Sequence, residues 1–370
     1  MPVFNLQLKK IVDDSYDIEI GYDLSDKLVS DILGGLLPKA NRFAVITDSN
    51  VLPLYARPIT DKLRAAGLPA EIFSFPAGEK SKSREVKAML EDEMLSRGFR
   101  RDCAVIAVGG GVVTDLAGFL AGTFGRGVPF VNYATTLLSA ADASVGGKTA
   151  VDTPLATNLI GLFNQPRKVY IDIQTWETLP VRELRSGLAE TVKHACLADA
   201  AFFAYLEENI DAVLRLEKTA CEHIALKNCE IKYKVVMQDE RESGLREVLN
   251  LGHTVGRAVE TVSDYRLTHG EAVAVGLVAA ARLAQELGYM TKAETERLEA
   301  LLVRCNLPVR IPEYVSREEL VRKLYTDKKV RNGKLRFVLQ DGIGAVKQFG
   351  ENVYALPVAE AQIASVIAKM

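Results

Sequence analysis

Residues 103–115 read CAVIAVGGGVVTD, and this stretch decides the fold. Its first six residues are apolar without alternation, which is typical of a strand buried on both faces of a parallel sheet. Three glycines follow, and residues 116–124 then continue as a helix. Glycines let a diphosphate approach the backbone, and the helix N-terminus offers N–H groups and the positive end of its dipole. The stretch therefore predicts a strand–turn–helix unit that binds a phosphate group, and a tight turn without a ligand is the simpler alternative.

Similar apolar runs flank this unit and predict further strands of the same sheet at residues 43–47, 71–75, 130–133 and 169–172. Residues 83–97 have the apolar spacing of an amphipathic helix. Strands that alternate with helices indicate an α/β fold with a parallel sheet.

From about residue 180 the pattern changes to long helical periodicities, at residues 200–216, 216–237, 251–262 and 271–287. The strand-like region left is a possible hairpin that joins residues 334–338 to 344–346. We therefore expect an α/β dinucleotide-binding domain over residues 1–180 and a mostly α-helical domain over residues 181–370. A cleft between two such domains is the default place for a cofactor and a substrate.

Composition excludes several other classes of protein. At roughly 150 residues per domain, 370 residues also suggest two domains. The chain has 46 basic and 48 acidic residues, and its net charge of −2 argues against a general binder of nucleic acid or anionic membranes. No stretch reaches 18 apolar residues without a charge. The five scattered cysteines indicate a reducing compartment, and we expect a cytoplasmic protein.

A second glycine-rich stretch, Gly146-Gly147-Lys148-Thr149, resembles the end of a nucleotide-binding P-loop. Asp142 stands where that motif has its first glycine, so hydrolysis of a nucleoside triphosphate is not expected. A lysine in a glycine-rich loop still suits a phosphate monoester on a small substrate. The alternative is a surface turn with a solvated lysine.

Two of the four histidines, His253 and His269, lie beside glycines. Two histidines and one carboxylate make a catalytic zinc site with an open position. Glu190 is the candidate carboxylate, and His194 is a rival ligand because it lies four residues later on the same helical face. A purely structural role for these histidines remains open at this point.

The charged run Asp239–Arg246 precedes His253 by a few residues. Charge runs are usually solvated turns, but this placement favours Glu242 and Arg246 as residues that face the site.

Seven segments, in the same order along the chain, resemble 3-dehydroquinate synthases, the sugar-phosphate cyclases of the shikimate pathway. The resemblance covers essentially the whole chain and implies conversion of 3-deoxy-D-arabino-heptulosonate 7-phosphate to 3-dehydroquinate and phosphate, with NAD and a divalent metal, zinc or cobalt. The segments are GGGVVTDLAGFLAGTFGRG (109–127), TTLLSAADASVGGKTAVD (135–152), NLIGLFNQP (158–166), TLPVRELRSGLAETVKH (178–194), DERESGLREVLNLGHTVG (239–256), LTHGEAVAVG (267–276) and DKKVRNGKLRFVLQDGIG (327–344).

The resemblance also implies roles for individual residues. It places the metal on Glu190, His253 and His269, and it places Arg126 against the substrate of a neighbouring subunit, which requires a homodimer. It implies NAD contacts from Asp48, Asn50, Gly78, Glu79, Lys80, Lys82, Gly110, Gly111, Val112, Val113, Thr114, Asp115, Thr135, Thr136, Lys148, Thr157, Thr175 and Thr178. Substrate or catalytic contacts are expected from Asp142, Lys148, Asn158, Lys193, Lys232, Glu242, Arg246, Asn250 and Arg257, with Lys328 or Lys329 near the phosphate.

Three residues depart from the family pattern. Thr157 replaces a lysine expected to touch NAD, Arg257 replaces a histidine one turn after the first histidine ligand, and Ala134 replaces a proline. Arg257 offers a permanent charge for a carboxylate or phosphate oxygen where a titratable group was expected. Other readings are therefore a related cyclase (of the 2-epi-5-epi-valiolone, 2-deoxy-scyllo-inosose or aminodehydroquinate type), a metal-dependent alcohol or glycerol dehydrogenase, or an NAD-binding protein without catalysis.

Overall fold

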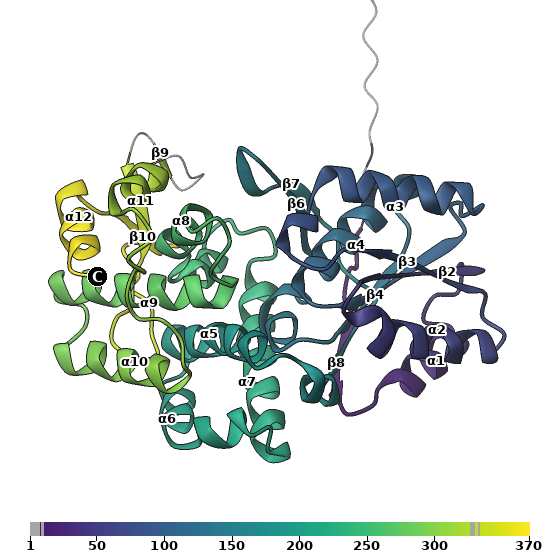
Figure 1. The fold of residues 1–370 in the computed structure, drawn as a ribbon, viewed down its shortest axis with the longest axis horizontal. Coiled ribbons are helices and arrows are strands. Elements are labelled where there is room, and N and C mark those ends of the chain that lie inside the picture. Colours follow the sequence, from purple (N-terminus) through teal and green to yellow (C-terminus); the bar gives the residue numbers. More distant parts are fainter. Residues whose placement is uncertain (1–7, 9–10, 326–329, 332–333) are drawn as a thin grey trace, which may run out of the picture.

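The computed structural model describes residues 8, 11–325, 330–331 and 334–370. Its N-terminal part is a six-stranded parallel sheet covered by helices on both faces, as the apolar runs predict (Figure 1). The strand order is β1-β8-β5-β4-β2-β3. The strands are β1 (Asp17–Gly21), β2 (Arg42–Asp48), β3 (Ala70–Phe75), β4 (Cys103–Gly109), β5 (Phe130–Ala134) and β8 (Lys168–Asp172), and the helices are α1 (Ser25–Leu33), α2 (Arg57–Ala65), α3 (Arg84–Ser96) and α4 (Gly111–Thr123).

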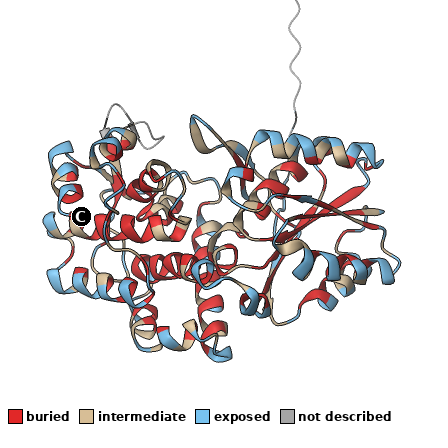
Figure 2. Cartoon of the chain, viewed as in Figure 1, coloured by how far each residue is buried: buried red, intermediate tan, exposed pale blue. Residues whose placement is uncertain are grey.

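Side-chain alternation along the strands explains why both faces are covered. In β2, Phe43 and Val45 pack with the buried residues of α1 and α2, whereas Ala44 and Ile46 pack on the opposite face with α3 and α4. Every residue of β4 is buried, as expected for a strand in the interior of the sheet. The sheet and the helix faces turned toward it form the buried centre of this part (Figure 2).

The C-terminal part is mostly helical, with α9 at its centre (Figure 1). α9 packs against α5, α8, α10 and α12, and nearly all of its small apolar residues are buried. The change from sheet to helices comes with α5, and the division into domains 1–180 and 181–370 stays a prediction. The helices are α5 (Val181–Ala198), α6 (Ala200–Leu214), α7 (Lys218–Gln238), α8 (His253–Val262), α9 (His269–Glu286), α10 (Lys292–Arg304), α11 (Arg317–Leu324) and α12 (Glu360–Ala368).

The pairing of the C-terminal strands differs from the sequence analysis. The hairpin expected between residues 334–338 and 344–346 is wrong: β10 (Lys334–Val338) pairs with β9 (Val330–Arg331) and β11 (Ala355–Pro357), and a single bridge joins Gln340 to Val346. The glycines at 342 and 344 have positive φ values and turn the chain away before a second strand can form.

The second glycine-rich stretch leads into a strand that the sequence analysis did not expect. β6 (Lys148–Thr153) forms an antiparallel hairpin with β7 (Ala156–Phe163). Because Lys148 begins a strand and not a helix, the loop is not a nucleotide-binding P-loop. Short helical turns complete the fold: η1 (Leu52–Ala56), η2 (Glu79–Ser81), η3 (Phe124–Arg126), η4 (Ser139–Ala143), η5 (Ile173–Thr178) and η6 (Leu245–Asn250).

Among the described residues, no helix has the length and apolar character needed to cross a membrane.

Candidate active site and metal centre

A cleft of about 900 Å³ lies where the carboxyl ends of the parallel strands meet α5, α8 and α9. Ligands of open α/β sheets bind at this edge, beside the point where the strand order reverses, here between β2 and β4. The cleft brings together most of the residues singled out from the sequence. Those that line it are Asp48, Asn50, Gly78, Glu79, Lys82, Gly110, Gly111, Val112, Asp115, Thr135, Thr136, Asp142, Lys148, Thr157, Asn158, Thr175, Thr178, Lys232, Glu242, His253, Arg257 and His269.

The glycine turn after β4 forms a cradle at one end of this cleft. α4 begins at Gly111, so the N–H groups of its first turn have no partner within the helix. A Cβ atom on Gly110 would lie 3.0 Å from Thr136 Cγ2, and one on Gly111 would lie 3.3 Å from the Cβ of Ala143. Side chains at these positions would fill the space beside the open N–H groups, so the turn fits a diphosphate of a dinucleotide.

A buried ion pair joins the walls of the same end. Lys82 Nζ lies 2.5 Å from a carboxylate oxygen of Asp115 on α4 and donates a 2.6 Å hydrogen bond to Asn158 on β7. Burial opposes the charge on Lys82, but Asp115 and Glu79 outweigh it and raise the pKa of the lysine above its ordinary value. The β6–β7 hairpin is thereby fixed against the first turn of α4.

The three expected metal ligands converge beside the same cleft. His253 Nε2 and His269 Nε2 lie 3.5 and 3.4 Å from the same carboxylate oxygen of Glu190. The Glu190 side chain is fully buried, and neither of its oxygens has a hydrogen bond of good geometry among the described residues. Lys193 contacts Oε2, whereas Oε1 faces the two imidazoles, and a buried carboxylate oxygen so placed fits a divalent cation with three protein ligands and an open position.

The second ring nitrogen of each histidine fixes which atom faces Glu190. His253 Nδ1 donates to the backbone carbonyl of Leu251 at 3.1 Å, and His269 Nδ1 lies 3.4 Å from Glu260 Oε2. Since Nδ1 carries the proton in His253, its Nε2 lone pair is turned toward the metal position. Burial opposes the charge on His269, but Glu260 and Glu190 outweigh it and raise the pKa of His269 to about 10, so a metal would displace the Nε2 proton of that ring. Burial holds the pKa of His253 well below its usual range, which favours the neutral ring that a metal requires.

His194, the rival ligand, belongs to a second group with Asp142 and Glu190, whose ligand atoms lie within 4.8 Å of one another. Two ammonium groups already neutralise this group, because Lys193 pairs with Glu190 and Lys232 pairs with Asp142. Lys193 borders both sets through Glu190, but a divalent cation here would also meet Lys232, so the set of Glu190 with the other two histidines is the better metal site.

The cations that line the cleft differ in their partners: Arg182 pairs with Glu271, and Arg266 lies over the ring of Tyr314. Lys82, Lys148 and Lys232 each pair with a carboxylate of the chain, namely Asp115, Glu242 and Asp142. Arg257 also lines the cleft, one helical turn after His253, but its guanidinium has no hydrogen bond or ion pair among the described residues. Arg257 is therefore a permanent charge available to an anionic ligand.

Three expected substrate residues lie behind the cleft wall. Lys193 is 1% exposed and contacts Glu190. Arg246 donates to the carbonyls of Glu240 and Gly146 and holds the second glycine loop in place. Asn250 donates a 2.6 Å hydrogen bond to Glu242 and orients that carboxylate.

Besides Glu190, Lys193, Arg246 and Asn250, four more expected residues do not line the cleft. Lys80 is exposed outside it, while Val113 and Thr114 are buried inside the first turn of α4. Arg126 is exposed beyond the end of α4 in a left-handed conformation, with φ 73°. Lys328 and Lys329 lie outside the described residues.

The sequence analysis missed several residues of the cleft wall. Glu260 is seven residues after His253, on the same face of α8, and this spacing is the signal that could have found it. Asp152 lies on β6 and Tyr55 in η1, and only the folded hairpin and the sheet bring them to the cleft. Tyr55 contacts Thr178 through a 2.6 Å hydrogen bond between their hydroxyls.

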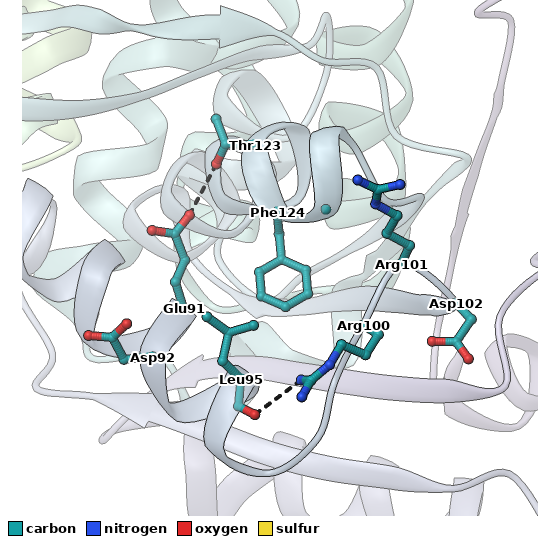
Figure 3. A pocket seen from close by; sticks show the side chains of 9 residues that line it. Glu91, Asp92, Leu95, Arg100, Arg101, Asp102, Thr123 and Phe124 are labelled. Atoms are coloured by element: carbon teal, nitrogen blue, oxygen red, sulfur yellow. Dashed lines mark hydrogen bonds between the residues drawn. The ribbon is translucent and has the colours of Figure 1, made fainter.

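A second hollow, of about 680 Å³, lies on the outer side of α3 and α4 (Figure 3). Glu91 accepts from Thr123 there, and Arg100 donates to the carbonyl of Leu95. These groups satisfy one another at the surface, and none of the expected site residues lines this hollow.

Comparison with known proteins gives concordant matches. The family description "3-dehydroquinate synthase N-terminal" matches residues 72–186, and "3-dehydroquinate synthase C-terminal" matches residues 187–330. A 3-dehydroquinate synthase of Desulforamulus reducens is 43% identical over 356 residues, which are 96% of this chain and 97% of that protein.

Two solved structures are also similar. A 2-epi-5-epi-valiolone synthase from Streptomyces hygroscopicus, with NAD+ and Zn2+ bound, superposes with a TM-score of 0.87 at 28% identity over 99% of each chain. A 2-deoxy-scyllo-inosose synthase complexed with carbaglucose-6-phosphate, NAD+ and Co2+ superposes with a TM-score of 0.85 at 25% identity, over 95% of this chain and 96% of that one.

Proposed function

The chain belongs to the 3-dehydroquinate synthase family, and from that membership and the cleft we propose that it is itself a 3-dehydroquinate synthase. It converts 3-deoxy-D-arabino-heptulosonate 7-phosphate to 3-dehydroquinate with release of phosphate. The observation that carries this proposal is one cleft that combines a dinucleotide cradle, a Glu/His/His metal site and several cations.

Two groups from outside the chain are needed. When bound, NAD supplies a reversible hydride acceptor, and the divalent metal supplies a Lewis acid that polarises a substrate oxygen. Glu190, His253 and His269 would hold the metal. NAD would lie along Asp48, Gly78 and the glycine turn, which line the same cleft.

The remaining residues position a sugar phosphate that carries two anionic groups, a carboxylate and a phosphate. Lys148, Lys232 and Arg257 line the cleft and offer charged donors to the carboxylate and phosphate oxygens. Glu242 and Asp142 hold the two lysines in fixed places before the substrate arrives. Such preorganisation keeps the substrate in one reactive conformation while phosphate leaves by β-elimination from the carbon next to the acidified C–H bond.

We propose that the active form is a homodimer to which Arg126 contributes across the interface. The support is that Arg126 is exposed, lies between two glycines with positive φ, and has no hydrogen bond or ion pair within the described chain. Backbone strain of this kind is retained where a function needs it, and a second subunit gives this arginine an anion to bind. The cytoplasmic location stays a prediction from the sequence.

A related cyclase or a simple alcohol dehydrogenase is the alternative. A simple alcohol needs no set of anion-binding cations, which favours a phosphorylated, carboxylated substrate. The test is incubation of the purified protein with NAD, Zn2+ and the heptulosonate phosphate. We expect one phosphate and one 3-dehydroquinate per substrate consumed, detected by phosphate assay and mass spectrometry. Phosphate release without a carbocyclic product would overturn the proposal.

A further inference from the structure

We propose that Glu260 is a positioning residue for the metal centre, acting through the ring of His269. The inference rests on the proposed function, because it assumes that His269 is a metal ligand. Glu260 Oε2 lies 3.4 Å from His269 Nδ1, on the side of the ring opposite Glu190. The histidine is thus held between two carboxylates, one at each nitrogen.

The two histidines differ in what holds them. His253 donates its Nδ1 proton to a neutral backbone carbonyl, that of Leu251, which its own chain segment supplies. His269 is the first residue of α9, and the carboxylate that faces it comes from α8. Glu260 therefore joins the two helices that carry the histidine ligands, and it sets the rotation of one ring relative to the other.

The surroundings of Glu260 keep it ready for this role. Its side chain is 13% exposed, and it lies three residues after Arg257 on α8. A charged acceptor behind a ligating imidazole raises the basicity of the coordinating nitrogen and fixes its direction. Glu260 has no other side-chain hydrogen bond among the described residues, so its placement serves the histidine.

The test is a metal affinity, measured on metal-stripped full-length protein by competition with a chromophoric chelator for Zn2+. We expect Glu260→Gln, which keeps the shape but removes the charge, to weaken Zn2+ binding about 10-fold, and Glu260→Ala to weaken it up to about 100-fold. The Co2+ absorption spectrum of Glu260→Gln should also change, since a rotated imidazole alters the ligand field.

The matched control is Asp264→Asn. Asp264 is exposed one turn beyond Glu260, and asparagine tolerates its left-handed backbone, with φ 54°. This variant removes the same charge from the same region without touching a histidine, so its Zn2+ affinity should stay within about twofold of the parent, as for an exposed and screened charge. Unfolding midpoints of the metal-free proteins show whether each variant is folded, and Glu260→Asp replaces Glu260→Gln if the latter is not.

The outcomes separate the two proposals. If the parent and His253→Ala bind Zn2+ equally, the metal site itself is wrong and the proposed function fails. A second outcome is that the parent binds Zn2+ tightly and His253→Ala does not. If Glu260→Gln then matches the parent in Zn2+ affinity and in Co2+ spectrum, only the inference about Glu260 is wrong.

Discussion

His253 and Arg257 lie one turn apart on α8, and both line the same cleft. The His253 ring is neutral and turns its Nε2 atom toward Glu190. The Arg257 guanidinium is permanently charged and has no hydrogen bond or ion pair among the described residues. This neighbouring pair places an anion-binding group beside the metal position, and it leads to the first prediction.

Arg257→Ala should lower kcat/KM for the sugar phosphate at least tenfold, equivalent to about 1.4 kcal/mol of transition-state stabilisation. Arg257→His should retain substantial activity, because a histidine can donate a hydrogen bond from a similar place. Arg266 is the matched control: it also lines the cleft but stacks on Tyr314, and Arg266→Ala should have a much smaller effect. If Arg257→Ala behaves like the parent in steady-state kinetics, the residue is a solvated helix charge.

Metal content distinguishes the two groups of ligand-type residues. His269→Ala and Glu190→Gln should lose bound metal and nearly all turnover, whereas His194→Asn should keep one metal ion per chain. His194 donates from Nδ1 to Asn228 at 3.0 Å, and asparagine preserves a donor at that place. Elemental analysis after dialysis, with activity before and after chelator treatment, checks both. Full activity of His269→Ala in metal-free buffer contradicts the assignment.

Titration of Lys148 should make kcat/KM depend on pH. Partial burial in the cleft, with the nearby charges of Arg246 and Lys232, lowers the pKa of Lys148 to about 8, although its side chain is still 44% exposed and Glu242 acts in the opposite direction. Lysine is positively charged below its pKa, so the contact with a substrate anion is present below about pH 8 and lost above it. We therefore expect kcat/KM to fall as the pH rises through this value. Lys148→Arg should move the limb upward, and an unmoved limb would assign it to another group.

Position 157 tests the dinucleotide wall. Thr157 lines the cleft at the position where the resemblance led us to expect a lysine. Thr157→Lys should tighten NAD binding by about 1–2 kcal/mol, the scale of one charged hydrogen bond, without changing which sugar phosphate is used. Calorimetric titration with NAD measures the change in NAD affinity. Competition between sugar phosphates measures whether the substrate preference changes. A switch of sugar preference would place this loop in the substrate site.

The strands of the sheet could be predicted because their residues are apolar on both faces, as in β4. β1 escaped prediction since Asp17–Gly21 alternates acidic and apolar residues at the edge of the sheet, where one side is open. The β6–β7 hairpin was hidden because Gly146 and Gly147 are typical of a loop, and the strand begins at the very next residue.

The metal ligands could be proposed from residue types and their glycine neighbours, but their geometry could not. His253 and His269 meet Glu190 only because α5, α8 and α9 pack together, and that packing depends on long-range apolar contacts. Glu260 was overlooked for the same reason: its spacing from His253 shows a shared helix face, whereas its partner is on another helix.

NAD should act catalytically, because substrate and product have the same oxidation level. During steady turnover of the sugar phosphate, absorbance at the NADH band should stay flat while phosphate accumulates far beyond the amount of NAD present. Stoichiometric formation of NADH would favour a plain dehydrogenase.

The most direct measurement of the central claim is the initial rate of phosphate release from two substrates, with NAD and Zn2+ in excess. The account predicts rapid release from 3-deoxy-D-arabino-heptulosonate 7-phosphate and little or none from sedoheptulose 7-phosphate, which lacks the carboxylate that the cleft cations are placed to hold. Faster release from sedoheptulose 7-phosphate would contradict the account and identify the chain as a related cyclase.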